Sequence, residues 1–107
     1  MTVKDMEAAD VARLLDDDAI LLIDVREPEE YAAERIRGAL PFPLSTFDPA
    51  ALPDSGKRMV VFHCRSGVRS AKAAAACMAA GLPHNSHLKG GIVAWKSAGL
   101  ATITSAP

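Results

Sequence analysis

Long apolar runs are missing from this chain of 107 residues. No stretch approaches the ~20 consecutive apolar residues that cross a bilayer, and residues 1–5 lack the basic-then-apolar order of a signal peptide. We therefore expect a cytoplasmic protein that does not contact a membrane. The chain is also too short for two hydrophobic cores, so a single domain over residues 1–107 is predicted.

An excess of charge of either sign is missing as well. The formal net charge is −1, with 12 Lys and Arg against 13 Asp and Glu. This balance gives no reason to expect nucleic acid or an anionic membrane as a partner, and any positive field must be local. Half of the residues are apolar and 23% are charged, which is typical of a soluble globular protein. We expect a monomer or a weak dimer.

Cysteine is scarce, and the two present, Cys64 and Cys77, do not form a Cys-x-x-Cys pair. In an intracellular protein they are expected to be reduced thiols. A zinc site that joins them to His84 and His87 is disfavoured, because structural zinc ligands come in close pairs and only the two histidines are close. The acidic triplet 16–18 reads as a solvated turn. We expect no metal and no organic cofactor.

Apolar runs of strand length alternate with segments of helical periodicity, which predicts an α/β domain. Residues 19–25 form a continuous apolar run, the pattern of a strand buried on both faces of a parallel sheet. We expect a central, mainly parallel sheet of about five strands, with helices on both faces. The expected strands are 2–6, 19–25, 40–42, 59–63 and 87–88. The expected helices lie at about 8–15, from 28 onward, at 70–80 and at 92–98, and residues 101–107 are expected to be a frayed tail.

The stretch 59–70 carries the clearest chemical signal. A strand ends at Cys64, a short loop contains Arg65 and Arg69, and an alanine-rich helix begins directly after it. A free thiol has a pKa of about 8.5, and a useful nucleophile near neutrality needs that value lowered by roughly two units, or about 2.7 kcal/mol. A helix N-terminus supplies at most about 2 kcal/mol. Loop amides and the two arginines must supply the rest, and the same donors would bind an anionic substrate.

A structural role is the alternative for each of these residues. Cys64 could be a buried cysteine at a strand end, but two arginines, a glycine and a helix start within six positions favour a reactive thiol. Cys77, about two helical turns further on, is interpreted as a small core residue. His63 precedes Cys64 in the strand and points to the opposite face, so it is expected to pack and not to act as a base.

The segment from Cys64 to Ser70 resembles the active-site loop of the rhodanese-like sulfurtransferases, in which a cysteine becomes a persulfide. Four residues separate Cys64 from Arg69; in that family this spacing goes with sulfur transfer, whereas the related cell-cycle dual-specificity phosphatases have five. Three further segments resemble rhodanese motifs in the expected order, although Arg35 stands where the family usually has histidine. These segments are 23–31, 36–39 and 88–95.

The resemblance implies roles for individual residues. Cys64 would be the catalytic nucleophile, and the loop residues that would hold the anion are Arg65, Ser66, Gly67, Val68 and Arg69. Ser70 would support the site, as would Asp24 and Arg26, which we expect to point to opposite faces and to pair with neighbouring loops.

The implied function is that of a single-domain thiosulfate sulfurtransferase. Cys64 would take sulfane sulfur from thiosulfate or a similar small anionic donor and pass it to cyanide in an assay, or to a thiol or protein in the cell. Three alternatives remain open: a persulfide carrier or docking module with little turnover on small molecules, a cysteine-dependent phosphatase, and an oxyanion-reducing thiol enzyme, for which Cys77 would be a poor second thiol.

Overall fold

The computed structural model describes residues 2–104 and contains a five-stranded sheet in the order β1-β6-β5-β2-β4. Every pairing in this sheet is parallel, so the predicted α/β fold with a parallel sheet is confirmed. The strands are β1 (Lys4–Met6), β2 (Ile20–Asp24), β4 (Leu40–Pro41), β5 (Met59–His63) and β6 (Ser86–Leu88).

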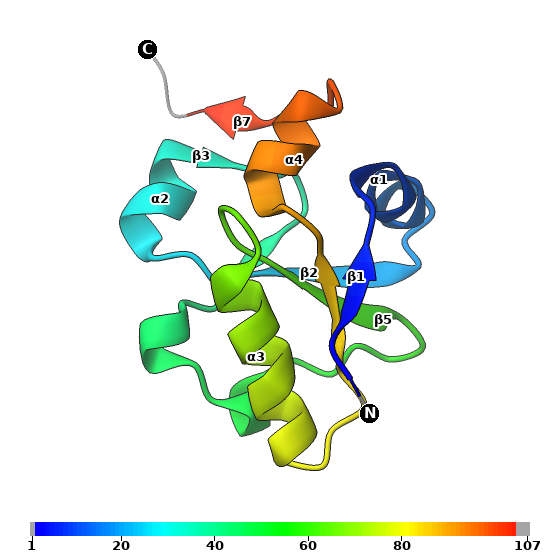
Figure 1. The fold of residues 1–107 in the computed structure, drawn as a ribbon, viewed down its shortest axis with the longest axis vertical. Helices are drawn as coiled ribbons and strands as arrows, with labels where there is room; N and C mark the ends of the chain where they lie inside the picture. The colour runs from blue at the N-terminus through cyan, green and yellow to red at the C-terminus, as the bar shows by residue number, and fades with distance from the viewer. Residues whose placement is uncertain (1, 105–107) are drawn as a thin grey trace.

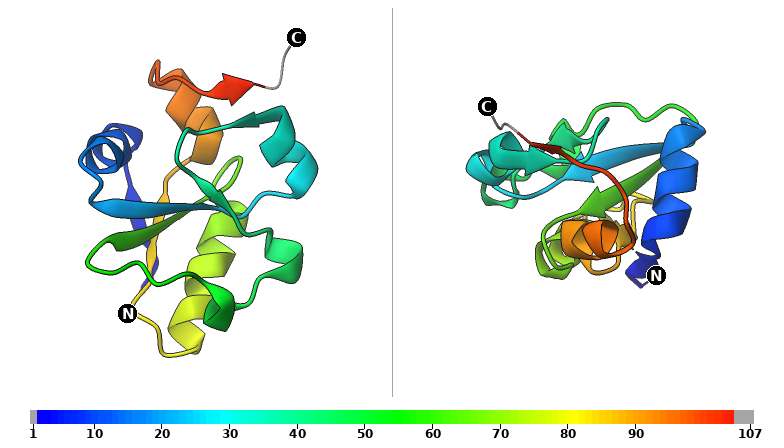
Figure 2. Two further views of the ribbon diagram at one scale, coloured as in Figure 1. Left: turned by 180° about the vertical axis from the view of Figure 1, so that it is seen from behind. Right: turned by 90° about the horizontal axis from the view of Figure 1, so that it is seen from above.

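Helices cover both faces of the sheet, as Figures 1 and 2 show. On one face lie α1 (Ala8–Asp16) and α4 (Gly91–Ser97), and on the other lie α3 (Val68–Ala79) and the 3-10 turns η1 (Leu44–Thr46) and η2 (Pro49–Ala51). The short helix α2 (Pro28–Ala33) follows β2 and leads into β3 (Glu34–Arg35). Each face therefore has its own hydrophobic layer.

Strand β2 shows why its sequence is continuously apolar. Ile20 and Leu22 pack into the layer beneath α1 and α4, whereas Leu21 and Ile23 pack into the layer beneath α3. Successive side chains of a strand point to opposite faces, so a strand covered on both sides needs apolar residues at every position. All five residues of β2 are buried, which agrees with the prediction of an inner strand.

The expectation of a frayed tail from residue 101 is wrong for residues 101–104. Strand β7 (Ile103–Thr104) pairs antiparallel with β3 to form a second, two-stranded sheet. The Trp95 indole N–H donates to the Ala101 carbonyl at 2.9 Å, and the Thr102 hydroxyl donates to the Glu34 carboxylate at 2.6 Å. The composition of this short segment did not predict its backbone pairing. The rest of the predicted tail, 105–107, lies outside the described residues.

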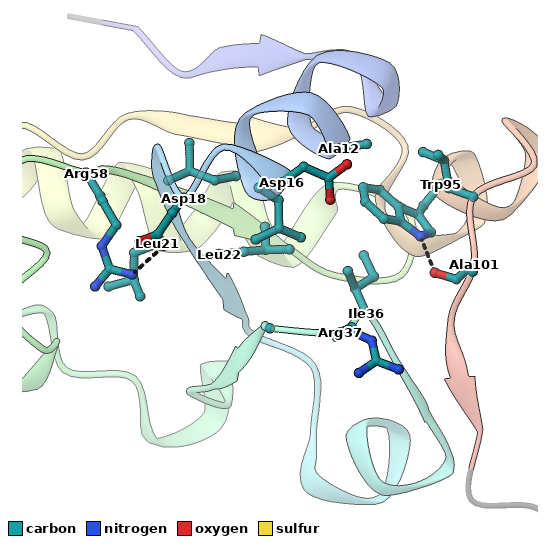
Figure 3. A pocket seen from close by; sticks show the side chains of 14 residues that line it. Ala12, Asp16, Asp18, Leu21, Leu22, Ile36, Arg37, Arg58, Trp95 and Ala101 are labelled. Atoms are coloured by element: carbon teal, nitrogen blue, oxygen red, sulfur yellow. Dashed lines mark hydrogen bonds and ion pairs between the residues drawn. The ribbon is translucent and has the colours of Figure 1, made fainter.

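One pocket among the described residues lies away from the loop between Cys64 and Ser70. It has a volume of about 560 Å³ and is formed by α1, the start of β2 and the turn after β3, as Figure 3 shows. Leu22, Ile36 and Trp95 give it an apolar floor, and Arg58 lies 3.5 Å from Asp18 at its edge. Ligands in parallel α/β sheets bind at the carboxyl ends of strands, whereas this pocket adjoins the amino end of β2. Within residues 2–104 no helix is long and apolar enough to cross a membrane.

Candidate active site

Cys64 follows β5 directly, and the next three residues carry the chain into α3. Gly67 caps that helix with a φ of +109°, a conformation that favours glycine. This turn brings two backbone amides to the cysteine sulfur: Gly67 N–H donates to Sγ at 3.1 Å and Ser70 N–H at 3.4 Å. The Ser70 hydroxyl oxygen lies 3.5 Å from the same sulfur. The sulfur therefore lies in a cradle of hydrogen-bond donors at the helix N-terminus.

The outer side of the loop is held by α4. Ile92 N–H donates to the Cys64 carbonyl at 2.9 Å, and Val93 N–H donates to the Arg65 carbonyl at 3.2 Å. These carbonyls satisfy the first free amides of α4. The contact is close, because a Cβ built on Gly91 would lie 2.4 Å from both carbonyl oxygens. Helix α4 thus holds the carbonyls of Cys64 and Arg65 pointing away from the sulfur, while the amides of Gly67 and Ser70 point toward it.

Cys64 is only 1% exposed and packs in the same apolar layer as Phe62 and Ala73. Such burial is what a structural cysteine would show, so the donors around the sulfur must decide its chemistry. Burial alone raises the pKa of the Cys64 thiol, but hydrogen bonds from the Ser70 hydroxyl and from the amides of Ser70, Gly67 and Ser66 outweigh it, and the net pKa is lowered. These hydrogen bonds include the loop amides that were expected to activate the thiol, and Arg69 is attracted to the Cys64 thiolate by charge.

Arg69 is held by a carboxylate of α2. Its two terminal nitrogens donate to the two Glu30 oxygens at 2.6 and 3.0 Å. This bidentate bond, opposed by burial and reinforced by a backbone bond from Glu27, lowers the pKa of Glu30 to about 2. The pair is fixed on the Glu30 side by a capping box at the start of α2. A guanidinium has five N–H donors, so Arg69 retains donors for an anion while its orientation is set by Glu30.

The other predicted loop residues contribute in different ways. Three of them have exposed side chains: Arg65, Ser66 and Val68, the last being 63% exposed. Arg65 also lines a pocket of about 320 Å³ together with Glu30, Val93 and Lys96. The structure therefore brings the predicted loop together, with backbone amides facing the sulfur and a cationic side chain at the loop surface.

Asp24 and Arg26 pair with each other, so the prediction that they point to opposite faces and to separate loops is wrong. Residues two apart in an extended chain lie on the same side, and the Arg26 guanidinium donates to the Asp24 carboxylate at 2.8 and 3.1 Å. Arg26 also donates to the Glu34 carbonyl at 2.6 Å. The buried pair lies beside His63, whose Nε2 is 3.4 Å from Asp24 Oδ2. It therefore supports the end of β5 and makes no contact with the sulfur.

We expect the burial of His63 to make the stability of the protein depend on pH. Its side chain is fully buried, and Nε2 is the one buried side-chain N or O atom among residues 2–104 without a hydrogen-bond partner. Burial lowers the pKa of His63 below 6.5, and the nearby Asp24 carboxylate opposes this only in part. The unfolded chain therefore binds the proton at a higher pH than the folded chain does. We expect the free energy of unfolding to be largest above pH 6.5 and to decrease as the pH falls below that value. Urea unfolding of the native chain and of His63→Gln between pH 7.5 and 5.5 tests this; an equal slope in both would contradict it.

A histidine that the sequence analysis considered only as a zinc ligand lies beside the cradle. His87 on β6 places Nδ1 2.8 Å from the Ser70 hydroxyl and Nε2 2.7 Å from Asp5 Oδ1 on β1. In the described part of the chain, no three His, Cys, Asp or Glu side chains gather as a metal site would require. The signal that could have found His87 is the parallel pairing of β6 with β5, which places both strand ends at the same edge of the sheet.

Comparison with known families is consistent with this geometry, since the model of the rhodanese-like domain matches residues 7–98. The chain belongs to the rhodanese-like domain family. It is similar to a sulfurtransferase of Allochromatium vinosum, with 40% identity over 92 residues and 85% of each chain covered. It is also 42% identical over 91 residues to an uncharacterized protein of Synechocystis sp., of which it covers 51%, with 85% of its own length aligned.

A solved structure shows the same rhodanese-like fold. The thiosulfate sulfurtransferase of Pseudomonas aeruginosa superposes with a TM-score of 0.81 at 25% identity, covering 97% of this chain and 21% of that one. The chain thus spans about half the length of the Synechocystis protein and a fifth of the Pseudomonas protein. The family match supports sulfur transfer as the general class of function.

Proposed function

We propose that this rhodanese-like domain moves sulfane sulfur from thiosulfate, or a similar small anionic donor, to a thiophilic acceptor through a persulfide on Cys64. The observation that carries the proposal is the cradle around Sγ, with amide donors at 3.1 and 3.4 Å and a hydroxyl at 3.5 Å. The same donors stabilise a thiolate before the reaction and an anionic persulfide after it. The two free thiols fit a reducing compartment such as the cytoplasm.

The chemistry takes place in two displacements. The Cys64 thiolate attacks the outer sulfur of thiosulfate, the S–S bond of the donor breaks, and sulfite leaves with the electron pair. Cyanide, a thiol or a protein acceptor then attacks the terminal persulfide sulfur, and Cys64 leaves as the thiolate. No net oxidation is required, and the cradle holds the developing negative charge in both steps.

The deciding experiment measures the mass of the intact protein after incubation with thiosulfate. We expect one added sulfur atom, its loss when cyanide is added, and catalytic formation of thiocyanate. A protein that gains no sulfur from thiosulfate or from any other sulfane donor would contradict the proposal. Hydrolysis of an aryl phosphate that exceeds sulfur transfer would favour the phosphatase alternative, which the four-residue spacing between Cys64 and Arg69 disfavours.

A persulfide carrier that delivers sulfur to a protein is the second candidate. Two apolar side chains lie exposed near the loop, Val68 at 63% and Val93 at 48%. The backbone N–H of Val93 donates a hydrogen bond to the Arg65 carbonyl, which holds Val93 beside the loop. Exposed apolar groups beside a reactive sulfur are suited to contact a protein acceptor. Efficient turnover from thiosulfate to cyanide would favour the enzyme over the carrier.

Arg69 is expected to affect the use of the donor more than the reactivity of the thiol. Arg69→Ala removes charge-assisted hydrogen bonds that are worth roughly 1.5–3 kcal/mol each, so the KM for thiosulfate should rise by about tenfold or more. Alkylation of Cys64 by neutral iodoacetamide should change much less, because the sulfur is activated by the cradle. Arg69→Lys keeps the charge but not the bidentate geometry toward Glu30. Equal losses in both assays would show that Arg69 acts on the thiol.

A further inference from the structure

A continuous chain of hydrogen bonds connects the catalytic sulfur to the protein surface. Ser70 on α3 lies between Cys64 Sγ at 3.5 Å and His87 Nδ1 at 2.8 Å, and His87 Nε2 lies 2.7 Å from Asp5 Oδ1. Strand pairing places Asp5 directly opposite His87. Ser70 is fully buried and His87 is 6% exposed, whereas the Asp5 side chain is 61% exposed. The inner end of the chain is therefore dry, and its outer end meets solvent.

Counting protons along this chain links the charge on His87 to the charge on the sulfur. The Asp5 carboxylate only accepts, so His87 Nε2 must carry a proton. When the ring is neutral, Nδ1 has a lone pair and takes the one hydrogen of the Ser70 hydroxyl. The serine oxygen can then only accept at the sulfur, which suits a neutral thiol.

Protonation of His87 reverses this arrangement. Both ring nitrogens then donate, Nδ1 toward Ser70 and Nε2 toward Asp5. The Ser70 hydrogen is released from the ring and can point to a thiolate at Cys64, or to the Gly67 carbonyl at 3.2 Å. The hydroxyl is therefore able to donate to the sulfur only when the histidine is charged, and it accepts from the thiol when the histidine is neutral.

We propose that His87 is a positioning residue that takes up the proton of Cys64 through the Ser70 hydroxyl and holds it against Asp5. The S–H bond breaks as its proton passes to the Ser70 oxygen, while the Ser70 proton passes to Nδ1. The products are a thiolate and an imidazolium, with no change in oxidation state and no proton lost. The groups that carry charge at the two ends of this series of hydrogen bonds are Cys64 and Asp5. The residue of β5 that lies opposite His87 is the uncharged Phe62. This assignment rests on the proposed function only in its use of a Cys64 thiolate.

The test is the pH profile of Cys64 alkylation by iodoacetamide, compared among native, His87→Gln and Ser70→Ala proteins. In His87→Gln we expect the midpoint of the profile to move upward, with alkylation about tenfold slower near neutral pH but equal to native at high pH, where every thiol is ionised. Loss of a residue needed only for folding would not produce this pattern, in which the midpoint moves and the rate at high pH equals the native one. His84→Gln, which alters a histidine outside the chain of hydrogen bonds, should leave the profile unchanged.

Two further variants keep the outcome decisive. The His87→Gln effect should disappear in a Ser70→Ala background, because the link is then already broken. If His87→Gln does not fold, Asp5→Asn at the exposed end should shift the midpoint in the same direction by a smaller amount. The assignment would be overturned if the His87→Gln and Asp5→Asn profiles both superposed on the native one. It would also be overturned if His87→Gln had its full effect in the Ser70→Ala background. If the native protein showed the alkylation profile of an ordinary, unactivated thiol, the proposed function itself would fail, because it depends on an activated Cys64.

Discussion

Cys64→Ser is expected to abolish sulfur loading and to reduce sulfur transfer from thiosulfate by roughly 10⁴-fold or more, since the covalent intermediate can no longer form. The serine hydroxyl fits the space of the thiol, so the fold should be retained. Intact mass after incubation with thiosulfate measures the loading, and thiocyanate formation measures the turnover. The cradle that lowers the pKa of Cys64 cannot bring a serine hydroxyl into its ionised form near neutrality.

Cys77→Ser is the matched control, because it alters the other cysteine of the chain. Cys77 is fully buried in the layer beneath α3, and burial raises the pKa of its thiol. Cys77→Ser should therefore load and transfer sulfur as the native chain does, with a loss of stability from the buried hydroxyl of about 1–3 kcal/mol. Sulfur that remains on Cys64→Ser but is absent from Cys77→Ser would move the active site to Cys77 and contradict the assignment.

Gly91→Ala should have the largest effect on stability of any single methyl addition near the site. The new Cβ would lie 2.4 Å from the carbonyl oxygens of Cys64 and Arg65, and the backbone at Gly91 has a φ of +59°. Backbone atoms cannot yield as a flexible side chain can, so the bonds from α4 to the loop must break. We expect a loss of about 3 kcal/mol or more, from the left-handed backbone, the overlap and the broken bonds together.

Gly56→Ala separates the two causes of this loss. Gly56 has nearly the same backbone, with a φ of +62°, but a Cβ there would meet nothing within 4 Å. It should cost only the backbone strain of about 1–2 kcal/mol, or roughly 4–16 °C in Tm. Thermal unfolding and sulfur loading of both variants make the comparison. Equal losses of stability would show that the contact of α4 with the loop contributes little.

The fold could be predicted from the sequence, because short contiguous segments of the sequence each indicate a strand, a helix or a loop. The apolar run of β2 and the alanine-rich segment after the loop each indicate one element, and the prolines after Gly38 exclude a long helix or an inner strand there. The pairing of β7 with β3 was missed, because it joins two-residue strands that lie far apart in the sequence, with Glu34 opposite Thr104, and depends on backbone hydrogen bonds. No hydrophobic periodicity marks such short strands.

The candidate site divides along the same line. Cys64 and its loop could be identified because the residues are contiguous, and the role of the amides follows from the helix start. Three partners could not be identified. Glu30 and His87 contact loop residues across 39 and 17 positions, and Asp5 contacts His87 across 82 positions. The burial of Cys64 was also unexpected, since a reactive thiol is ordinarily partly accessible.

The bonds from α4 to the loop carbonyls have a consequence for the whole molecule. The sulfur side of the loop belongs to the layer beneath α3, while its carbonyl side is bonded to a helix of the opposite layer. The loop that follows Cys64 therefore connects the two hydrophobic layers on the opposite faces of the sheet. A change that loosens the packing on one face of the sheet should therefore also disturb the loop that holds the Cys64 sulfur.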